Sequence, residues 1–306
     1  MINAKFVGRF SPVGAACRPR LPIFAAGRPL LRGARSVVAT VIEFVLFGLL
    51  AVLLTSCGSA PQRPPAALEQ AQSADKSARR ALREGDLVRA RALFAETLTL
   101  QQSLDNLPAV ATALINLSTV AHRQHDDAAA LGLLDRVLAG GPPYPAQMRA
   151  AAAFRKAVIQ LDAGRTGEAE SALALAEKEC AEPCALRPGF LNLQARLAMG
   201  RADYAAALAL VQPITAKMEM DKEELGNARR IAAAAEAALG RQEAALGDYQ
   251  AALELDKELG LSSRIAEDLG GIASALARLG RKDEAEGYAR RAQAVSEVAV
   301  TAGRTR

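Results

Sequence analysis

A turn position followed by two apolar positions recurs six times along this chain, and no other feature restricts its possible folds so strongly. An Ala stands five residues after each turn position, and a larger apolar residue stands nine residues after it. In the last copy the larger residue, Tyr288, comes one place early. A regular period of about 38–40 residues predicts an array of similar supersecondary units. The turn positions are Gly85, His125, Gly164, Ala202, Gly240 and Gly280.

This spacing is typical of helix hairpins. Gly ends a helix in a left-handed conformation at little cost, and an acidic residue soon afterwards suits the N-terminus of the next helix. The Ala fits where two antiparallel helices cross most closely, and the larger residue lies on the same helical face four positions later. One hairpin cannot bury its apolar face alone, so stability requires stacking on its neighbours. The helix-breaking segment at 140–145, Gly-Gly-Pro-Pro-Tyr-Pro, separates the second and third hairpins.

The segment Arg241–Asp256, RQEAALGDYQAALELD, resembles the tetratricopeptide repeat in its helix-turn-helix form. The resemblance covers about residues 68–300 and implies an all-α solenoid of about six stacked antiparallel helix hairpins. The standard repeat has about 34 residues, so these hairpins should have longer helices or connections. The resemblance also implies a role in binding a protein or peptide partner, with the first helix of each unit lining the concave surface.

Composition and charge agree with such an array. Hydrophobic residues make up 51% of the 306 residues and aromatic residues only 4%, which indicates helices packed closely through Ala. The net charge of +5 is local: residues 1–56 carry a net +6, which leaves −1 for the remainder. No basic stripe with interleaved aromatic residues is present. We therefore expect no nucleic-acid binding.

The N-terminal segment predicts export and a lipid anchor. An apolar run from Val37 to Leu54, interrupted by Glu43, leads directly into Leu54-Thr55-Ser56-Cys57. This sequence resembles a bacterial lipobox, in which the Cys thiol receives a diacylglycerol before cleavage. Its position after an apolar region of about 7–15 residues is typical of a signal peptide. We expect Cys57 to be lipidated, with no other cofactor.

These features divide the chain into four parts. Residues 1–56 form a lipoprotein signal peptide with an over-extended N-terminus, and a Pro-rich tether covers 57–67. The repeat domain covers 68–300, and a disordered tail follows over 301–306. Gly58 takes the place of the Asp that favours inner-membrane retention, so we expect an envelope protein at the outer membrane, facing the periplasm.

The favoured function is therefore a lipid-anchored scaffold or adaptor in envelope assembly. The alternative is an uncleaved single-pass protein whose repeats face the cytoplasm as a regulatory interaction module. The arginines before the apolar run oppose that topology, because positive flanks stay inside.

Cys180 and Cys184 flank Ala-Glu-Pro in the connection between the third and fourth hairpins. In an oxidising compartment we expect them to form a disulfide. Free thiols are the first alternative. A metal or redox pair is the second, although the sequence offers no further ligands.

We find no catalytic motif, metal-ligand set or small-molecule site, so no enzymatic activity is expected. Gly270-Gly271 lies within a helical unit, where Gly permits close packing. The remaining candidates are polar residues on the first helices, whose alternative role is an ordinary hydrated surface. These partner-binding groove candidates are Asn116, Thr119, Arg123, Arg155, Asn192, Arg196 and Arg230.

Overall fold

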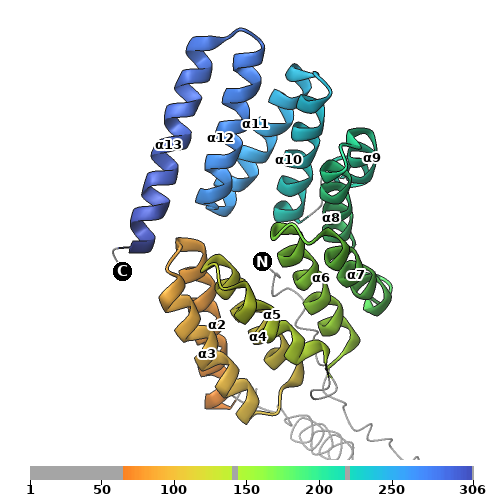
Figure 1. The fold of residues 1–306 in the computed structure, drawn as a ribbon. Helices are drawn as coiled ribbons and strands as arrows, with labels where there is room; N and C mark the ends of the chain where they lie inside the picture. The colour runs from red at the N-terminus through yellow and green to blue at the C-terminus, as the bar shows by residue number, and fades with distance from the viewer. Residues whose placement is uncertain (1–64, 140–143, 218–220, 305–306) are drawn as a thin grey trace, which may run out of the picture. The chain divides into compact units, whose positions relative to one another are not determined.

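The protein is described here by a computed structural model that covers residues 65–139, 144–217 and 221–304. This part of the chain contains twelve α-helices and no strand. Consecutive helices pair into six hairpins, from α2–α3 to α12–α13 (Figure 1). The predicted all-α solenoid of six hairpins is thus confirmed. The helices are α2 Ala66–Glu84, α3 Leu87–Ser103, α4 Leu107–Arg123, α5 Asp127–Leu138, α6 Ala146–Asp162, α7 Thr166–Glu179, α8 Arg187–Gly200, α9 Tyr204–Thr215, α10 Lys222–Ala238, α11 Gln242–Leu259, α12 Ser262–Arg278 and α13 Lys282–Arg304.

The six predicted turn positions share one backbone geometry. Each has a positive φ, from 59° at Ala202 to 81° at Gly85. The amide of the following residue donates to the carbonyl five positions earlier, as Asp86 does to Ala81 and Asp203 to Ala198. This Schellman arrangement satisfies carbonyls at the end of one helix. In three of the turns the following residue is an Asp whose carboxylate caps the next helix.

The small and large positions of the repeat form the core of the hairpins. The Ala five residues after the turn is fully buried in the first five hairpins and 7% exposed at Ala285. The larger residue is buried in the first four hairpins, as at Phe94 and Leu134, and partly buried at Tyr249 and Tyr288. Local spacing therefore identified the packed face of each second helix.

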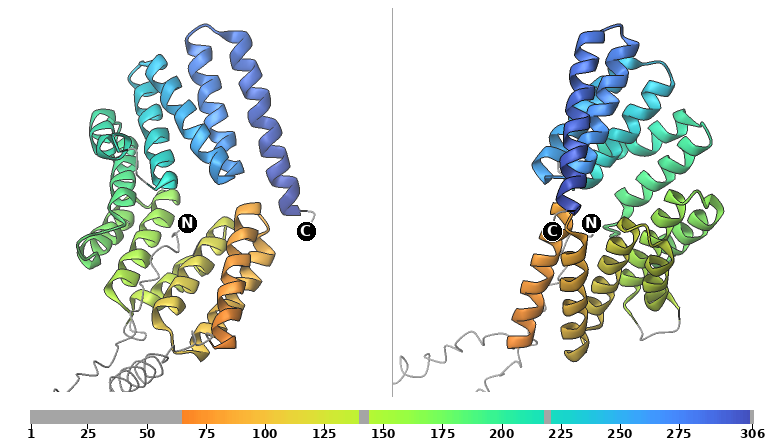
Figure 2. Two further views of the ribbon diagram at one scale, coloured as in Figure 1. Left: turned by 180° about the vertical axis from the view of Figure 1, so that it is seen from behind. Right: turned by 60° about the vertical axis from the view of Figure 1, so that its left-hand side comes forward.

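The first and second helices have different neighbours. The first helices α4, α6, α8, α10 and α12 contact one another in sequence, in addition to their own hairpin partners. Second helices pack against the first helix of their own hairpin and of the next one. Both views in Figure 2 show successive hairpins side by side. The first helices from α4 to α12 therefore form a continuous row.

The boundaries of the repeat domain differ slightly from those predicted. Helix α2 begins at Ala66, inside the expected tether, and α13 continues through residues 301–304 of the expected tail. Ala at 302 favours continuation of the helix. The signal peptide, Cys57 and the tether as far as residue 64 lie outside the described residues. No helix within the described ranges has the length and apolar character needed to cross a membrane.

Close packing explains one member of the Gly270-Gly271 pair. A Cβ atom on Gly271 would lie 2.5 Å from Cε1 of Tyr249 on the preceding helix, which is far inside van der Waals contact. The prediction of a packing role is therefore confirmed for Gly271. A Cβ atom on Gly270 would meet nothing within 4 Å.

Ala202 occupies a left-handed position that Gly fills in four of the other five turns. An L-residue costs about 1–2 kcal/mol there, partly offset because Gly loses more entropy on folding. We expect Ala202→Gly to raise the free energy of unfolding by about 0.5–1 kcal/mol in urea titrations. Ala209→Gly, at an exposed position within α9, should instead lower it by about 1 kcal/mol. Equal signs for the two variants would contradict this assignment.

Candidate functional site

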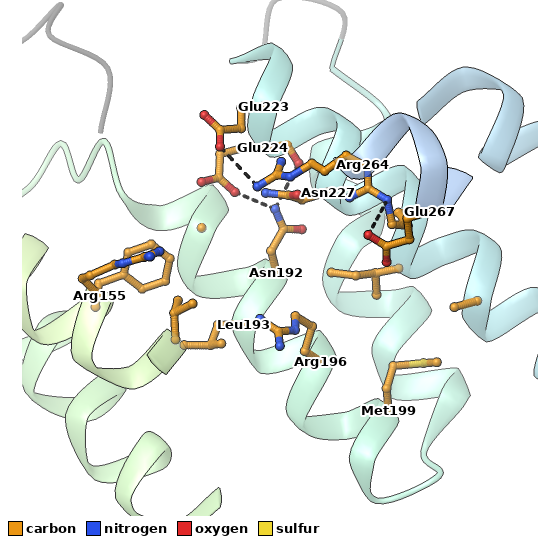
Figure 3. A pocket seen from close by; sticks show the side chains of 16 residues that line it. Arg155, Asn192, Leu193, Arg196, Met199, Glu223, Glu224, Asn227, Arg264 and Glu267 are labelled. Carbon is orange, nitrogen blue, oxygen red and sulfur yellow. Dashed lines mark hydrogen bonds and ion pairs between the residues drawn. The ribbon is translucent and has the colours of Figure 1, made fainter. Parts of the chain in front are cut away.

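A groove of about 530 Å³ lies on the first helices of the third to sixth hairpins (Figure 3). Its lining residues come from α6, α8, α10 and α12, and none comes from a second helix. Within each helix they recur every three or four positions, which places them on one helical face. The charged and amide side chains among them are Arg155, Asn192, Arg196, Glu223, Glu224, Asn227, Arg230, Arg264 and Glu267.

The structure brings four of the seven predicted groove residues together here. These are Arg155, Asn192, Arg196 and Arg230.

The other three predicted residues lie on α4, outside this groove. Asn116 and Thr119 are buried, and the Thr119 hydroxyl donates to the carbonyl of Ile115. Arg123 reaches back to donate to the carbonyl of Leu82 on α2. Of the three, only Arg123 makes a hydrogen bond to another hairpin; the Thr119 bond lies within α4, and Asn116 Nδ2 is buried without a partner.

Sequence analysis missed the acidic side of the groove and Arg264. Glu223 precedes the turn at Gly240 by 17 residues, and Arg264 precedes the turn at Gly280 by 16. The predicted residues lie nearer to their turns. Extending the same helical face by two turns toward the N-terminus would have found both.

Several side chains that line the groove already form ion pairs or hydrogen bonds within the protein. Arg196 Nη2 lies 2.5 Å from Asp162 Oδ1, and Arg264 Nη2 lies 3.2 Å from Glu223 Oε1. Asn192 Nδ2 donates to Glu224 twice, at 2.7 Å to the carboxylate and 3.0 Å to the backbone carbonyl. Burial raises the pKa of the Glu224 carboxyl, and the Asn192 donor opposes this effect.

Arg155 differs from these groups. It makes no hydrogen bond or ion pair with any residue that the structure describes, and its Nε is buried without an acceptor. Burial lowers the pKa of the Arg155 guanidinium to about 10, with a further contribution from the positive charge of Arg123. At neutral pH the side chain remains a cation, and it has no ion-pair partner among the described residues.

Arg230 joins the fifth and sixth hairpins through two buried carboxylates. Its Nε lies 2.7 Å from Asp268 Oδ1 on α12, and its Nη2 pairs with Asp256 on α11. Both Asp side chains are fully buried. One cation cannot balance two buried carboxylates, so one of the two Asp side chains tends to remain protonated. Accordingly, burial raises the pKa of Asp268 to about 7 despite Arg230, and the Asp256 charge adds to the rise.

This shift makes stability depend on pH. Between about pH 4 and pH 7 the folded state retains a proton on Asp268 that the unfolded state releases, so stability falls as pH rises through this window. We expect Asp268→Asn to flatten that decline and to be more stable than wild type at pH 8. Urea unfolding from pH 5 to pH 8 measures the slope. The exposed Asp283→Asn should leave it unchanged, and an unaltered slope in Asp268→Asn would refute the assignment.

Cys180 and Cys184 form a disulfide in the connection between α7 and α8, with Cα atoms 5.6 Å apart. Both side chains pack beside the apolar cluster that contains Leu173 and Phe190. Among the described residues, no group of three His, Cys, Asp or Glu side chains is arranged to hold a metal ion.

Solved structures provide the comparison for this fold. A Rap protein complexed with competence and sporulation factor is 16% identical, with a TM-score of 0.55 over 76% of this chain and 66% of the Rap chain. A signal transduction ATPase with numerous domains and a tetratricopeptide repeat sensor, from Pyrococcus horikoshii, is 15% identical. Its TM-score is 0.53, over 86% of this chain and 41% of the ATPase. No protein-family model matches the chain, and no curated protein matches it.

The helix order and these similarities define the class as a tetratricopeptide-like α-solenoid. This chain spans about two thirds of the Rap protein and about two fifths of the ATPase. At these sequence identities the similarity concerns the fold alone.

Proposed function

We propose that this protein is a non-catalytic, membrane-anchored adaptor that binds an extended segment of a partner protein in its groove. The observation that carries the proposal is the set of hydrogen-bonding groups that line the groove and have no partner. Arg155 Nε, Arg264 Nη1 and Asn192 Oδ1 are buried without partners. Buried polar groups normally have hydrogen-bond partners. The backbone of an extended chain supplies both N–H donors and carbonyl acceptors.

The solved neighbours support a peptide or protein as the occupant. The Rap protein is described in complex with competence and sporulation factor.

The anchor is the second part of the proposal. Cys57 follows an apolar segment and precedes a Pro-rich stretch, as expected for a lipoprotein whose folded part is held away from the membrane. Two or three acyl chains on one Cys anchor a protein firmly, whereas one chain is marginal. We place the adaptor at the outer membrane, facing the periplasm, with a role in envelope assembly.

Cross-linking in intact cells, followed by purification of the protein, tests the groove. With the double variant Arg155→Glu/Arg196→Glu, the amount of cross-linked partner recovered should fall about tenfold or more. The two reversed charges would repel a partner segment whose charge complements the wild-type groove. Arg91→Glu/Arg136→Glu makes the same charge change at exposed positions on the second helices α3 and α5 and should retain them. Equal recovery with both double variants would remove the groove from the proposal.

Palmitate labelling tests the anchor. Wild type should incorporate label, Cys57→Ser should not, and Cys17→Ser should label normally because Cys17 lies within the cleaved segment. An unlabelled membrane protein of precursor size would instead support the uncleaved, cytoplasm-facing alternative.

A further inference from the structure

Arg155 is the one arginine lining the groove that has no ion-pair partner among the described residues. Arg196 pairs with Asp162, and Arg264 pairs with Glu223. Arg230 is held by buried carboxylates, and Glu267 lies 3.7 Å from it. Glu224 accepts hydrogen bonds from Asn192. No ion pair or hydrogen bond reaches Arg155 from any described residue, and no dashed line reaches it in Figure 3.

The two carboxylates whose charges favour the cationic form of Arg155 are already engaged in ion pairs. Asp162 accepts from Arg196 and also lies 3.2 Å from His122 Nε2. Glu223 is paired with Arg264. Each of these carboxylates therefore already has a cationic partner, and neither forms an ion pair with Arg155.

Burial makes the missing partner costly. A charge removed from water needs an opposite charge and hydrogen bonds to offset its desolvation. Arg155 Nε has no contact with water and no acceptor. Burial is the main reason that the pKa of Arg155 is lowered; the charges of Arg123 and Arg264 lower it further, whereas those of Asp162 and Glu223 oppose them. An incoming anion would therefore stabilise the arrangement, whereas an incoming cation would not.

A second unused group points to a peptide. Asn192 Oδ1 is a buried acceptor without a donor, while its Nδ2 is committed to Glu224. Inorganic phosphate or a free carboxylate could pair with Arg155 but brings few or no donors for Asn192. A polypeptide brings both groups, since each non-proline residue has an N–H and an acidic side chain adds the anion.

The remaining walls of the groove are apolar. Phe154, Val158, Leu193, Met199 and Ile231 lie between the charged groups. Phe154 is fixed by an edge-on contact with Phe190, at 5.3 Å between ring centroids. These surfaces favour an apolar side chain next to the acidic one in the bound segment.

We propose that the partner segment contains an Asp or Glu whose carboxylate pairs with Arg155, while an N–H of the segment donates to Asn192 Oδ1. This inference rests on the proposed function and names the chemistry of its partner. Arg155 and Asn192 are then the two residues that determine which segments bind, and an apolar residue flanks the acidic one.

An array of random nine-residue peptides, probed with the purified full-length protein in detergent, tests the inference. Wild type should select peptides with one Asp or Glu beside an apolar residue, and Arg155→Met should lose that selection. For one selected peptide, either Arg155→Met or a Glu→Gln change in the peptide should weaken binding by about tenfold or more. The two changes together should weaken binding no further, because both remove the same pair.

The controls separate the possible failures. Arg155→Met should unfold at no lower temperature than wild type, since it removes a partly buried charge that has no ion-pair partner. The selected peptide should raise the unfolding temperature of wild type more than that of the variant. Peptides bound without acidic preference, or a preference retained in Arg155→Met, would overturn the inference alone. No peptide bound at all would overturn the proposed function as well. If inorganic phosphate binds as tightly as the peptide, and Asn192→Ala does not change peptide binding, the groove is a site for small anions. That result would refute the proposal of a peptide ligand.

Discussion

Replacing Arg230 by Met should lower the free energy of unfolding of the C-terminal hairpins by about 3–5 kcal/mol at pH 8. The side chain is 11% exposed and balances Asp256 and Asp268, which are fully buried. Without Arg230, two ionised carboxylates would remain in the interior with no countercharge. Urea unfolding, together with amide hydrogen exchange in α10–α13, measures the loss and its position.

The pH dependence and a triple variant test the cause. Below about pH 5 both carboxyls of Arg230→Met can take up protons, so the loss should become smaller there than at pH 8. Arg230→Met/Asp256→Asn/Asp268→Asn should recover much of the stability at pH 8, because no buried charge remains. A loss of the same size at all pH values would mean that Arg230 acts through packing rather than charge.

Replacing Phe94 by Ala should cost about 3–5 kcal/mol, concentrated in the first hairpin. Phe94 is fully buried, and its cluster includes Leu82 on α2 and Val120 on α4. Because each hairpin packs only on its neighbours, the cavity should open α2–α3 without loosening distant hairpins. Hydrogen exchange should show protection lost first in these two helices, while α12 remains protected.

Two variants on the same helix control for this effect. Phe94→Leu keeps most of the volume and should cost less than Phe94→Ala. Val88→Ala changes a side chain that is 71% exposed and should stay within about 0.5 kcal/mol of wild type. A uniform loss of protection across all six hairpins would show that the array unfolds as one unit, which contradicts nearest-neighbour stacking.

Features set by local spacing could be predicted from the sequence. The six turns have the expected left-handed residue, even where His125 and Ala202 replace Gly, because the chain must reverse within three residues there. The Ala five positions later is buried in every hairpin, since helix geometry fixes its distance from the turn. Register with the turns also placed Arg155 and Asn192 on the face that forms the groove.

The tertiary structure alone decided which polar groups are paired. Arg230 meets partners 26 and 38 residues away, and no local pattern specifies such contacts. Asn116 and Arg155 each precede their turn by nine residues, yet one lies outside the groove and the other lines it. Residues a few positions apart thus determine the repeating helices and turns. The lack of an ion pair at Arg155 depends instead on how neighbouring hairpins stack, because burial and pairing are properties of the surroundings.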